Sequence, residues 1–266
     1  MSIFTIRMKL NLDIIPITLL EQYCSQVDDS LQTGFNALHD SELSIENFSF
    51  YTSVSAVFSS KIEGEKMELD SYIKHKRLGA HFLPDYTRKV DDLYDAYLFA
   101  QKTKLSADKI MNAHAIITKH ILQKAQQGNF RSGNMVVVTS DGKIEYTAAS
   151  PGLLKTEMEK LFGDIETLLA AELNFKEVFY FASMIHLVFV KIHPFEDGNG
   201  RTARLLEKWF IAQKLGTKAW YIQSEKNYYE QHQTYYDNIR HLGFEYATLD
   251  YSQALPFLLM LGEGVR

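Results

Sequence analysis

The sequence predicts an all-α, mostly helical protein with one β-hairpin, and three observations support this prediction. Apolar residues recur at spacings of three and four along most of the 266 residues, which is typical of helices with one buried face. Only five prolines interrupt these patterns, and strand-like runs are few. The exception is NMVVVTSDGKIEY, in which two short β-prone runs flank Asp141 and Gly142. This arrangement is a strong signal of a hairpin.

Helices are expected wherever the spacing of three and four persists, with ends defined to about two to four residues. Ser106 and Ser150 are expected N-caps, the second followed by a proline in the first turn, and Gly216 is expected to end a helix. The predicted helices cover residues 17–40, 44–63, 66–78, 86–102, 106–125, 151–172, 175–192, 201–215, 225–242 and 248–261.

Composition narrows the class of protein before any motif is considered. Apolar residues make up 46% of the chain, enough for a substantial core. The net charge of -5 predicts no general attraction to nucleic acid or to an anionic membrane. The single cysteine, Cys24, cannot form an internal disulfide. No apolar run approaches the roughly 18 residues of a spanning helix. We therefore expect a cytoplasmic protein, with residues 1–20 as a short strand or an extended arm.

The richest chemistry lies between two apolar helical segments, in HPFEDGNG at residues 193–200. His193 follows a helix that is apolar almost all round, and a neutral imidazole on such a rigid support can take a proton from a hydroxyl. Asp197 offers a carboxylate to a hard cation such as Mg²⁺, which shares its ligands between one or two carboxylates and substrate phosphates.

The glycine-rich end of this string predicts an anion pocket. Gly198, Asn199 and Gly200 leave backbone N–H groups exposed at the N-terminus of the next helix. Arg201 and Arg204 lie in the first turn of that helix, and arginine forks suit phosphate. A base, a metal ligand and a phosphate pocket together indicate phosphoryl or nucleotidyl transfer. A plain turn between helices, with His193 bonded to a carbonyl and the arginines in surface ion pairs, explains single residues but not the whole string.

The string HPFEDGNGRTAR resembles the signature of the Fic domain family, HPFx[D/E]GNGRxxR, at every specified position. The resemblance implies transfer of AMP from ATP, with Mg²⁺, to a Ser, Thr or Tyr hydroxyl of a target protein. It assigns deprotonation of that hydroxyl to His193 and the metal to Asp197. Binding of the nucleotide phosphates falls to Gly198, Asn199, Gly200, Arg201 and Arg204.

Two further segments extend the resemblance. GNFRSGNMVVV at residues 128–138 resembles the family's flap region, which implies that a flap at 134–147 covers the nucleotide. Met135, Val136, Val137 and Val138 are then candidate nucleotide neighbours. The segment YTAASPG departs from the proline-rich stretch of many relatives. NYYEQHQTYYDNI resembles the family's adenosine-binding helix and nominates Tyr228, although tyrosine-rich helices more often belong to a core.

The segment FSSKIEGE at residues 58–65 bears on regulation. Ser59 and Glu63 share a helix face, and Gly64 is placed to end the helix. A carboxylate in the last turn is disfavoured by the helix dipole and would gain from a cationic partner. By itself Glu63 fits a solvated glutamate. The segment resembles the Fic inhibitory motif [S/T]xxxE[G/N], in which Ser59, Glu63 and Gly64 are the specified residues. This resemblance implies that Glu63 pairs with Arg204 and blocks productive placement of ATP.

These patterns suggest two regions and leave three functions open. Residues 1–105 are expected to form an N-terminal helical region carrying the inhibitory motif (59–64). Residues 106–266 are expected to form a Fic catalytic core with the flap (134–147), the signature loop (193–204) and the C-terminal helices. The alternatives to AMP transfer are transfer of another nucleotidyl or phosphate group, removal of AMP, and a non-enzymatic nucleotide-binding regulator. A homodimer is compatible with the resemblance. No nucleic acid and no membrane are expected as partners.

Overall fold

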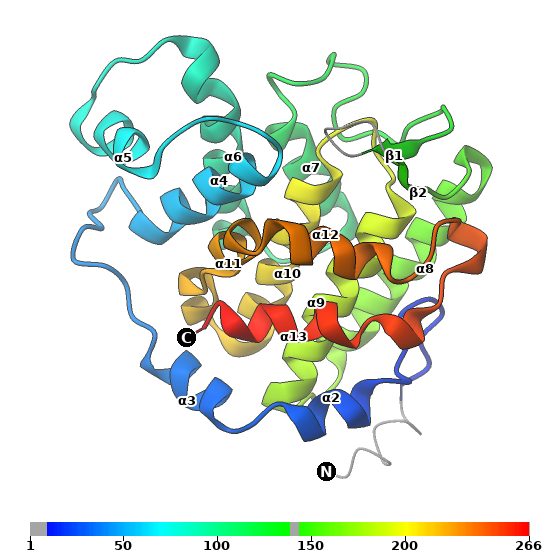
Figure 1. The fold of residues 1–266 in the computed structure, drawn as a ribbon. Coiled ribbons are helices and arrows are strands. Elements are labelled where there is room, and N and C mark those ends of the chain that lie inside the picture. The colour runs from blue at the N-terminus through cyan, green and yellow to red at the C-terminus, as the bar shows by residue number, and fades with distance from the viewer. Residues whose placement is uncertain (1–9, 139–143, 266) are drawn as a thin grey trace.

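The computed structural model describes residues 10–138 and 144–265. Helices dominate it, and within this part of the chain the strands form one antiparallel hairpin, β1 with β2. The predicted fold class, all-α with one hairpin, is confirmed (Figure 1). The predicted N-terminal arm up to residue 9 and the hairpin turn at Asp141 and Gly142 lie outside the described residues. The elements are α2 (Leu20–Gln26), α3 (Ser30–Ala37), α4 (Phe50–Ile62), α5 (Leu69–Leu78), α6 (Pro84–Lys102), α7 (Ala107–Ile117), β1 (Val136–Val138), β2 (Ile144–Thr147), α8 (Pro151–Ala170), α9 (Phe175–Ile192), α10 (Asn199–Leu215), α11 (Ser224–Glu230), α12 (His232–Arg240) and α13 (Leu255–Glu263), with short 3₁₀ turns at Thr217–Tyr221, Tyr246–Thr248 and Tyr251–Gln253.

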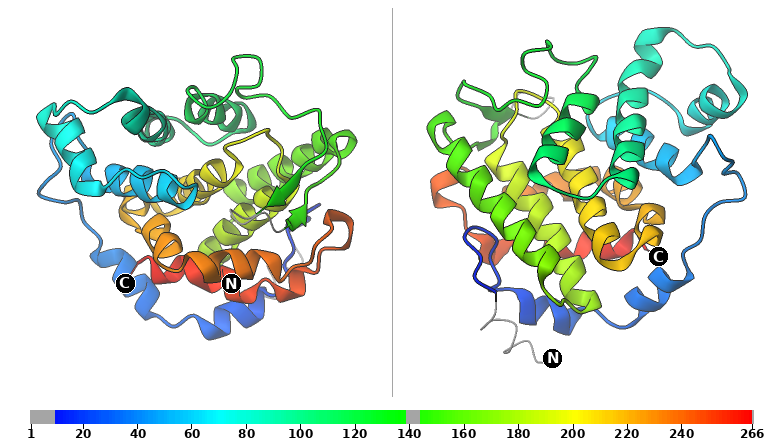
Figure 2. Two further views of the ribbon diagram at one scale, coloured as in Figure 1. Left: turned by 45° about the horizontal axis from the view of Figure 1, so that its top comes forward. Right: turned by 180° about the vertical axis from the view of Figure 1, so that it is seen from behind.

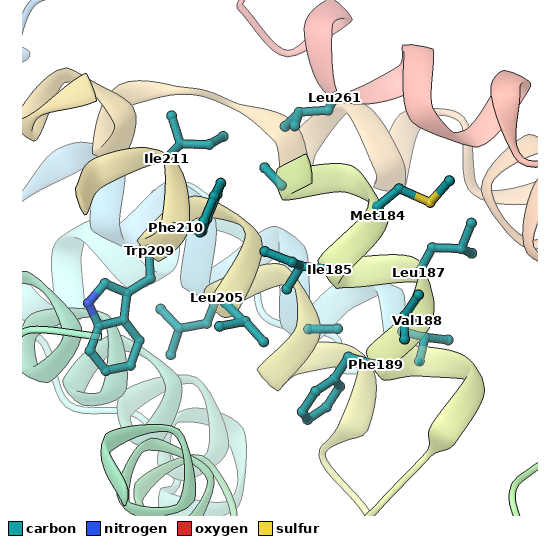
Figure 3. Packing of buried hydrophobic residues seen from close by; sticks show 14 of the residues in the cluster. Met184, Ile185, Leu187, Val188, Phe189, Leu205, Trp209, Phe210, Ile211 and Leu261 are labelled. Atoms are coloured by element: carbon teal, nitrogen blue, oxygen red, sulfur yellow. The ribbon is translucent and has the colours of Figure 1, made fainter. Parts of the chain in front are cut away.

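Helix α9 forms the centre of the core, as its apolar sequence predicts. A capping box starts it, in which Asn174 accepts from the Glu177 N–H and Glu177 accepts from the Asn174 N–H. Every residue from Glu177 to Ile192 is buried. Figure 3 shows Ile185 and Phe189 of α9 facing α10, while Met184 and Leu187 point away from it. Because α9 is packed on all sides, the residue that follows it is held on a rigid support.

The other helices surround α9 and α10. Helix α4 packs against α6 and α11, and α10 contacts α7 and α6 as well as α9. Figures 1 and 2 show α2 and α3 running beneath α13, so the N-terminal segment reaches the C-terminal helices. One hydrophobic cluster contains residues of both predicted regions, including Leu20 and Val57 from the first and Phe189 and Trp209 from the second. The boundary at residue 105 stays a prediction.

The N-terminal segment before α2 is held by a side chain rather than by strand pairing. The Asp164 carboxylate of α8 accepts hydrogen bonds from the N–H groups of Asp13, Ile14 and Ile15, at 2.7, 2.9 and 2.8 Å. Within residues 10–19 there is no strand. The expectation of a short strand is therefore wrong for these residues, since Asp164 satisfies the N–H groups that a strand partner would have bonded.

Helix ends differ from the predictions where tertiary contacts intervene. The predicted helix 17–40 is divided into α2 and α3, and the predicted helix 225–242 into α11 and α12. Helix α13 begins at Leu255 rather than at 248, because Pro256 lacks an N–H and fits only in a first turn. Ser106 and Ser150 occupy N-cap positions, but neither side chain makes a capping hydrogen bond. Gly216 ends α10 as predicted.

Helix α7 is shorter than predicted, ending at Ile117 rather than near 125. The His120 backbone N–H donates to the Asp92 carboxylate of α6 at 3.0 Å instead of continuing the helical ladder. Asp92 is buried and also accepts from the His120 ring at 2.8 Å. This contact across helices redirects the chain after α7. No helix in the described part of the chain is both long and apolar enough to cross a membrane.

Candidate functional site

The loop between α9 and α10 is built around two side chains that face inward. Phe195 is fully buried and stacks on the His114 ring, with the ring centroids 3.5 Å apart. Asn199 closes the loop, because its amide accepts from the Phe195 N–H and donates to the Phe195 carbonyl, both at 2.9 Å. The Asn199 side chain therefore shapes the loop, and only its backbone N–H remains for an anion.

His114 of α7 holds the centre of the loop between α9 and α10 through a hydrogen bond to its backbone. Its Nε2 lies 2.9 Å from the Asp197 carbonyl oxygen, and its Nδ1 accepts from the Gly128 N–H at 2.9 Å. The ring is fully buried, and burial lowers its pKa to about 4. It is therefore a neutral ring that donates through Nε2 and accepts through Nδ1. Gly198, with φ +80°, passes so close that a Cβ there would lie 2.7 Å from the Thr118 methyl carbon.

His193 caps the C-terminus of α9 in the left-handed region, with φ 54°. Its Nδ1 lies 3.0 Å from the Tyr146 hydroxyl and 3.3 Å from the Val190 carbonyl. The pKa of His193 is lowered to about 4, because burial and then the Arg131 guanidinium lower it by more than the hydrogen bond with Val190 and the charges of Glu63 and Asp197 raise it. The imidazole is neutral at physiological pH, the form that a general base requires.

Asp197 and Arg201 form a pair at the N-terminus of α10. An Arg201 terminal nitrogen (Nη2) donates to Asp197 Oδ1 at 2.7 Å, and the Asp197 side chain remains 47% exposed. An exposed carboxylate beside a helix N-terminus that favours anions suits Mg²⁺, which takes most of its ligands from water and substrate. The described residues contain no group of three or more His, Cys, Asp or Glu that could hold a metal by themselves.

Arg204 is fully buried and is the most extensively bonded side chain of the site. It donates to the Glu63 carboxylate at 2.6 Å, to the Ser59 hydroxyl at 2.8 Å and to the Ser59 carbonyl at 3.1 Å. It also donates to the Tyr235 hydroxyl at 3.3 Å. Burial alone would lower its pKa, but Tyr235 and Glu63 outweigh this effect and raise it. The guanidinium stays charged, and it joins α4, α10 and α12.

Glu63 lies at the end of α4, where the sequence places it. It is the C-cap of α4, and Gly64 follows with φ 90°. Burial would raise the pKa of Glu63, but the guanidiniums of Arg204 and Arg201 lower it overall. A Cβ at Gly200 would lie 2.6 Å from Glu63 Oε1. The carboxylate therefore lies directly over the first turn of α10, where the exposed N–H groups and the helix dipole favour an anion.

The hairpin is joined to the start of the loop by Arg131. Its backbone N–H donates to the Pro194 carbonyl at 3.0 Å and its Nε to the His193 carbonyl at 2.8 Å. The remaining guanidinium N–H groups donate to the carbonyls of Gly133 and Ala149, at the two ends of the hairpin. Val136 and Val138 are exposed, whereas Met135 and Val137 are half-buried against the core. None of these four candidates contacts the signature loop through a polar group, and their role toward a nucleotide stays a prediction.

Tyr228 is not brought to the surface of the loop. It is fully buried, its hydroxyl donates to the Glu207 carboxylate at 2.9 Å, and its ring packs on Phe257. His186 is also buried, with Nδ1 2.7 Å from Glu207 and Nε2 3.0 Å from the Tyr235 hydroxyl. These residues form a network behind Arg204. The position of this network favours a role in supporting Arg204 rather than in contacting a nucleotide. Tyr228 is placed as a tyrosine of a protein core would be.

Four residues that contribute to the site went unassigned from the sequence: Arg131, His114, Tyr146 and Tyr235. Arg131 lies in the segment that resembles the flap region, so a signal existed for it. His114 and Tyr146 lie 83 and 47 positions from their partners in or beside the loop. No local pattern marks contacts over such separations, which depend on the packing of whole helices.

Comparison with known proteins shows which family and which fold this chain is similar to. Residues 104–211 match the Fic/DOC family. The structure is similar to the crystal structure of a Fic family protein from Desulfovibrio desulfuricans G20, with a TM-score of 0.68 at 17% identity, over 97% of this chain and 73% of that chain. At this identity the likeness supports the fold alone.

Two curated proteins are similar over shorter segments. Protein adenylyltransferase Fic of Nematostella vectensis is 31% identical over 109 residues, which is 41% of this chain and 23% of that protein. The ribonucleoside-diphosphate reductase small chain of Ostreid herpesvirus 1 (isolate France) is 30% identical over 131 residues, 47% of this chain and 22% of that protein. The matched segments thus span less than a quarter of either relative.

Proposed function

Because the chain carries a Fic domain, we propose that it is a protein adenylyltransferase, which transfers AMP from ATP to a Ser, Thr or Tyr hydroxyl of a target protein, and that Glu63 inhibits it. One observation carries the proposal. The Glu63 carboxylate lies against Gly200 and bonds to Arg204, so an internal anion already lies over the helix end that the signature loop exposes. A site that holds a carboxylate there is suited to the anionic oxygens of a nucleotide.

The proposed reaction assigns proton transfer to His193. Its neutral imidazole takes the proton of the target hydroxyl, and the hydroxyl oxygen forms a bond to the α-phosphorus of ATP. The bond between that phosphorus and the oxygen bridging the α- and β-phosphates breaks, and the electron pair leaves with pyrophosphate. Arg201 and Arg204 counter the charge on the phosphates, together with the backbone N–H groups at the start of α10. The buried Arg201 Nε–H, which has no partner among the described residues, is available for this contact.

Asp197 is the residue that would hold Mg²⁺ in this scheme. Its half-exposed carboxylate has one oxygen bonded to Arg201, and it lies beside the proposed phosphate site. When bound, the ion would neutralise part of the phosphate charge. Asp197 then contributes in two ways, because it also fixes the direction in which Arg201 points.

Inhibition by Glu63 follows from competition for one guanidinium. Arg204 has two contacts to Ser59, one to Tyr235 and one to Glu63. A terminal phosphate that bonded Arg204 would have to displace the carboxylate, and two anions cannot share the same donor at this distance without strong repulsion. In the inhibited state, ATP could bind only in a position that leaves its α-phosphate out of line with His193.

The test is a labelling assay with α-³²P-ATP and Mg²⁺ on purified protein. We expect little self-labelling for the native chain and an increase of about tenfold or more for Glu63→Gly, since the competing charge is removed. Glu65→Gly is a matched control, because Glu65 is a neighbouring carboxylate that pairs with Lys89 rather than with Arg204. It should leave labelling unchanged. His193→Ala in the Glu63→Gly background should abolish labelling.

Mass spectrometry of the labelled side chain separates the related activities. A gain equal to one AMP group supports adenylyl transfer, and a different mass identifies another nucleotidyl or phosphate donor. A correctly folded Glu63→Gly protein that binds ATP but labels nothing would contradict the proposal and favour a nucleotide-binding regulator.

A further inference from the structure

Tyr146 of β2 contacts the candidate base directly, although it belongs to the flap. Its backbone pairs with Val137 in the hairpin, and its side chain is only 3% exposed. The hydroxyl oxygen lies 2.8 Å from the Val190 carbonyl oxygen and 3.0 Å from His193 Nδ1. A single phenol group thus joins the flap, the last turn of α9 and the imidazole.

Counting protons at this junction assigns the tautomer of His193. A phenol has one proton, and the Val190 carbonyl can only accept, so the short contact between them uses that proton. The Tyr146 oxygen then presents lone pairs to His193 Nδ1. The other neighbour of Nδ1, at 3.3 Å, is the same Val190 carbonyl. Because both neighbours accept, the proton of the neutral imidazole belongs on Nδ1, and Nε2 keeps its lone pair.

The position of Tyr146 is fixed on several sides. The Lys191 ammonium lies 4.2 Å from the centre of the Tyr146 ring, within the range of a cation–π interaction. The neighbouring Glu145 accepts two hydrogen bonds from Arg240, at 2.9 and 2.6 Å. On the other side of Tyr146, the Thr147 N–H donates to the Phe244 carbonyl at 2.7 Å. Strand β2 is therefore held against α9 and the segment after α12.

Burial keeps Tyr146 in the form that this arrangement needs. It raises the pKa of the phenol well above its usual value, so the hydroxyl retains its proton over the physiological range. The hydrogen bond to Val190 is then present whenever the strand is in place. The phenol adds no charge beside His193.

We propose that Tyr146 is a positioning residue that holds His193 in the Nδ1-protonated tautomer, so that Nε2 is free to take the proton of the target hydroxyl. Contact between β2 and α9 is then a requirement for a competent base, and the flap contributes to catalysis beyond any contact with nucleotide or target. This inference rests on the proposed role of His193 as base. The tautomer itself is a property of the chain without any substrate.

The primary experiment reads the tautomer directly. Protein labelled with ¹⁵N-histidine is examined by long-range ¹H–¹⁵N correlation NMR near neutral pH, and the His193 signals are identified from their loss in His193→Ala. We expect a protonated Nδ1 and an unprotonated Nε2 in the native chain, and a larger share of the Nε2-protonated tautomer in Tyr146→Phe, where only the Val190 carbonyl, 3.3 Å away, still accepts from Nδ1. Tyr180→Phe is the matched control, because Tyr180 is also a buried tyrosine whose hydroxyl donates to a carbonyl, that of Pro16 at 2.8 Å.

Kinetics in the Glu63→Gly background supply the second measurement. Tyr146→Phe should lower the maximal self-labelling rate by about tenfold, which corresponds to the loss of roughly one hydrogen bond. The ATP concentration that gives half of that rate should change less than about twofold, because the substitution leaves the phosphate contacts in place. Tyr180→Phe should change neither quantity.

The two measurements separate failure of this inference from failure of the proposed function. If the Glu63→Gly protein labels nothing, the proposed function fails, while the NMR result still decides the tautomer. If labelling occurs but native His193 carries its proton on Nε2, the inference is wrong. It is also wrong if Tyr146→Phe leaves both the tautomer and the maximal rate unchanged.

Discussion

Gly200 is the residue over which Glu63 fits most tightly. A Cβ added there would lie 2.6 Å from Glu63 Oε1 and 3.1 Å from an Arg204 terminal nitrogen, Nη1. Gly200→Ala should therefore destabilise the native chain. The cost should be smaller by about 1–2 kcal/mol in the Glu63→Gly background, where the side chain that it meets is absent. Urea denaturation of the four proteins of this double-mutant cycle measures the difference.

Gly163→Ala provides the control for this cycle. Nothing lies within 4 Å of a Cβ at Gly163, which is inside α8. Its effect on the free energy of unfolding should be the same with Glu63 or Gly at position 63. Equal costs of Gly200→Ala in the two backgrounds would show that the Glu63 carboxylate does not lie over the first turn of α10.

His114 makes stability depend on pH through its lowered pKa. Burial places that pKa at about 4 in the folded chain, against 6.5 for an unperturbed ring. The unfolded ring binds a proton below 6.5 and the folded ring only below about 4. The contribution of His114 to the free energy of unfolding is therefore complete above pH 6.5 and is lost as the pH falls toward 4. Between pH 7.5 and 5 this one residue should cost about 2 kcal/mol of unfolding free energy.

His114→Gln isolates this contribution, because glutamine keeps a donor and an acceptor but does not titrate. Other groups, including His193, also titrate in this range, so the informative quantity is the difference between the two proteins. The variant should lose less stability between pH 7.5 and 5, by about 2 kcal/mol. Parallel curves for the two proteins would contradict the buried, neutral state of His114.

Local sequence was sufficient to predict site residues where the chemically active side chains are close together in the chain. The string from His193 to Arg204 predicts the loop because its base, carboxylate, glycines and arginines lie within 12 residues of one another. Glu63 was identifiable from the spacing to Ser59 and Gly64 and from the resemblance. Tyr146 and Tyr235 were not, since a tyrosine in an amphipathic segment has the same local pattern whether its hydroxyl faces a carbonyl, a guanidinium or water.

At the scale of elements, α4 is fastened to the core by a buried ion pair at some distance from Glu63. Lys208 of α10 donates to the Glu225 carboxylate at 2.6 Å and to the Ser55 hydroxyl of α4 at 2.7 Å. Tyr97 of α6 donates to the other Glu225 oxygen at 2.5 Å. Lys208 and Glu225 are at most 1% exposed. This cluster joins α4, α6, α10 and α11, so relief of the proposed inhibition should involve the Glu63 end of α4 rather than departure of the whole helix.

Lys208→Met tests how firmly α4 is fastened. Removing one partner leaves the Glu225 charge buried, so the free energy of unfolding should fall by about 3–5 kcal/mol. Lys155→Met is the surface control, because Lys155 is 83% exposed in a pair at 3.9 Å, and it should change stability by no more than about 0.5 kcal/mol. Thermal or urea denaturation of both variants and of the native chain measures these changes in the free energy of unfolding. A loss below about 1 kcal/mol for Lys208→Met would mean that α4 is held mainly by apolar packing.

The elements themselves were predictable where one periodicity runs without interruption. Helix α9 was predicted with its observed bounds, because its apolar sequence and its capping residues agree. The break between α11 and α12 at Gln231 and the early end of α7 were not predictable. At the end of α7, the buried Asp92 carboxylate of α6 accepts from the His120 N–H, which would otherwise have continued the helical hydrogen bonds. Such competition is decided by tertiary contacts.

At the scale of the whole molecule, helix α4, which ends at Glu63, and the signature loop belong to one packed body. Residues of α4, α9 and α10 share a single hydrophobic cluster, and the polar contacts of Arg204 cross from α10 to α4. Folding itself therefore brings Glu63 next to the candidate catalytic residues of the signature loop. The proposed inhibition can then be relieved by a small displacement of the Glu63 carboxylate, without separating domains.

The most direct measurement of the central claim compares two radioactive forms of ATP on the Glu63→Gly protein. With α-³²P-ATP the label should become covalently attached to protein, in a reaction that His193→Ala abolishes. With γ-³²P-ATP no label should be attached, because the γ-phosphate leaves in pyrophosphate. Attachment from the γ-position, or from neither position in a folded protein that binds ATP, would contradict the account of this chain as an adenylyltransferase inhibited by Glu63.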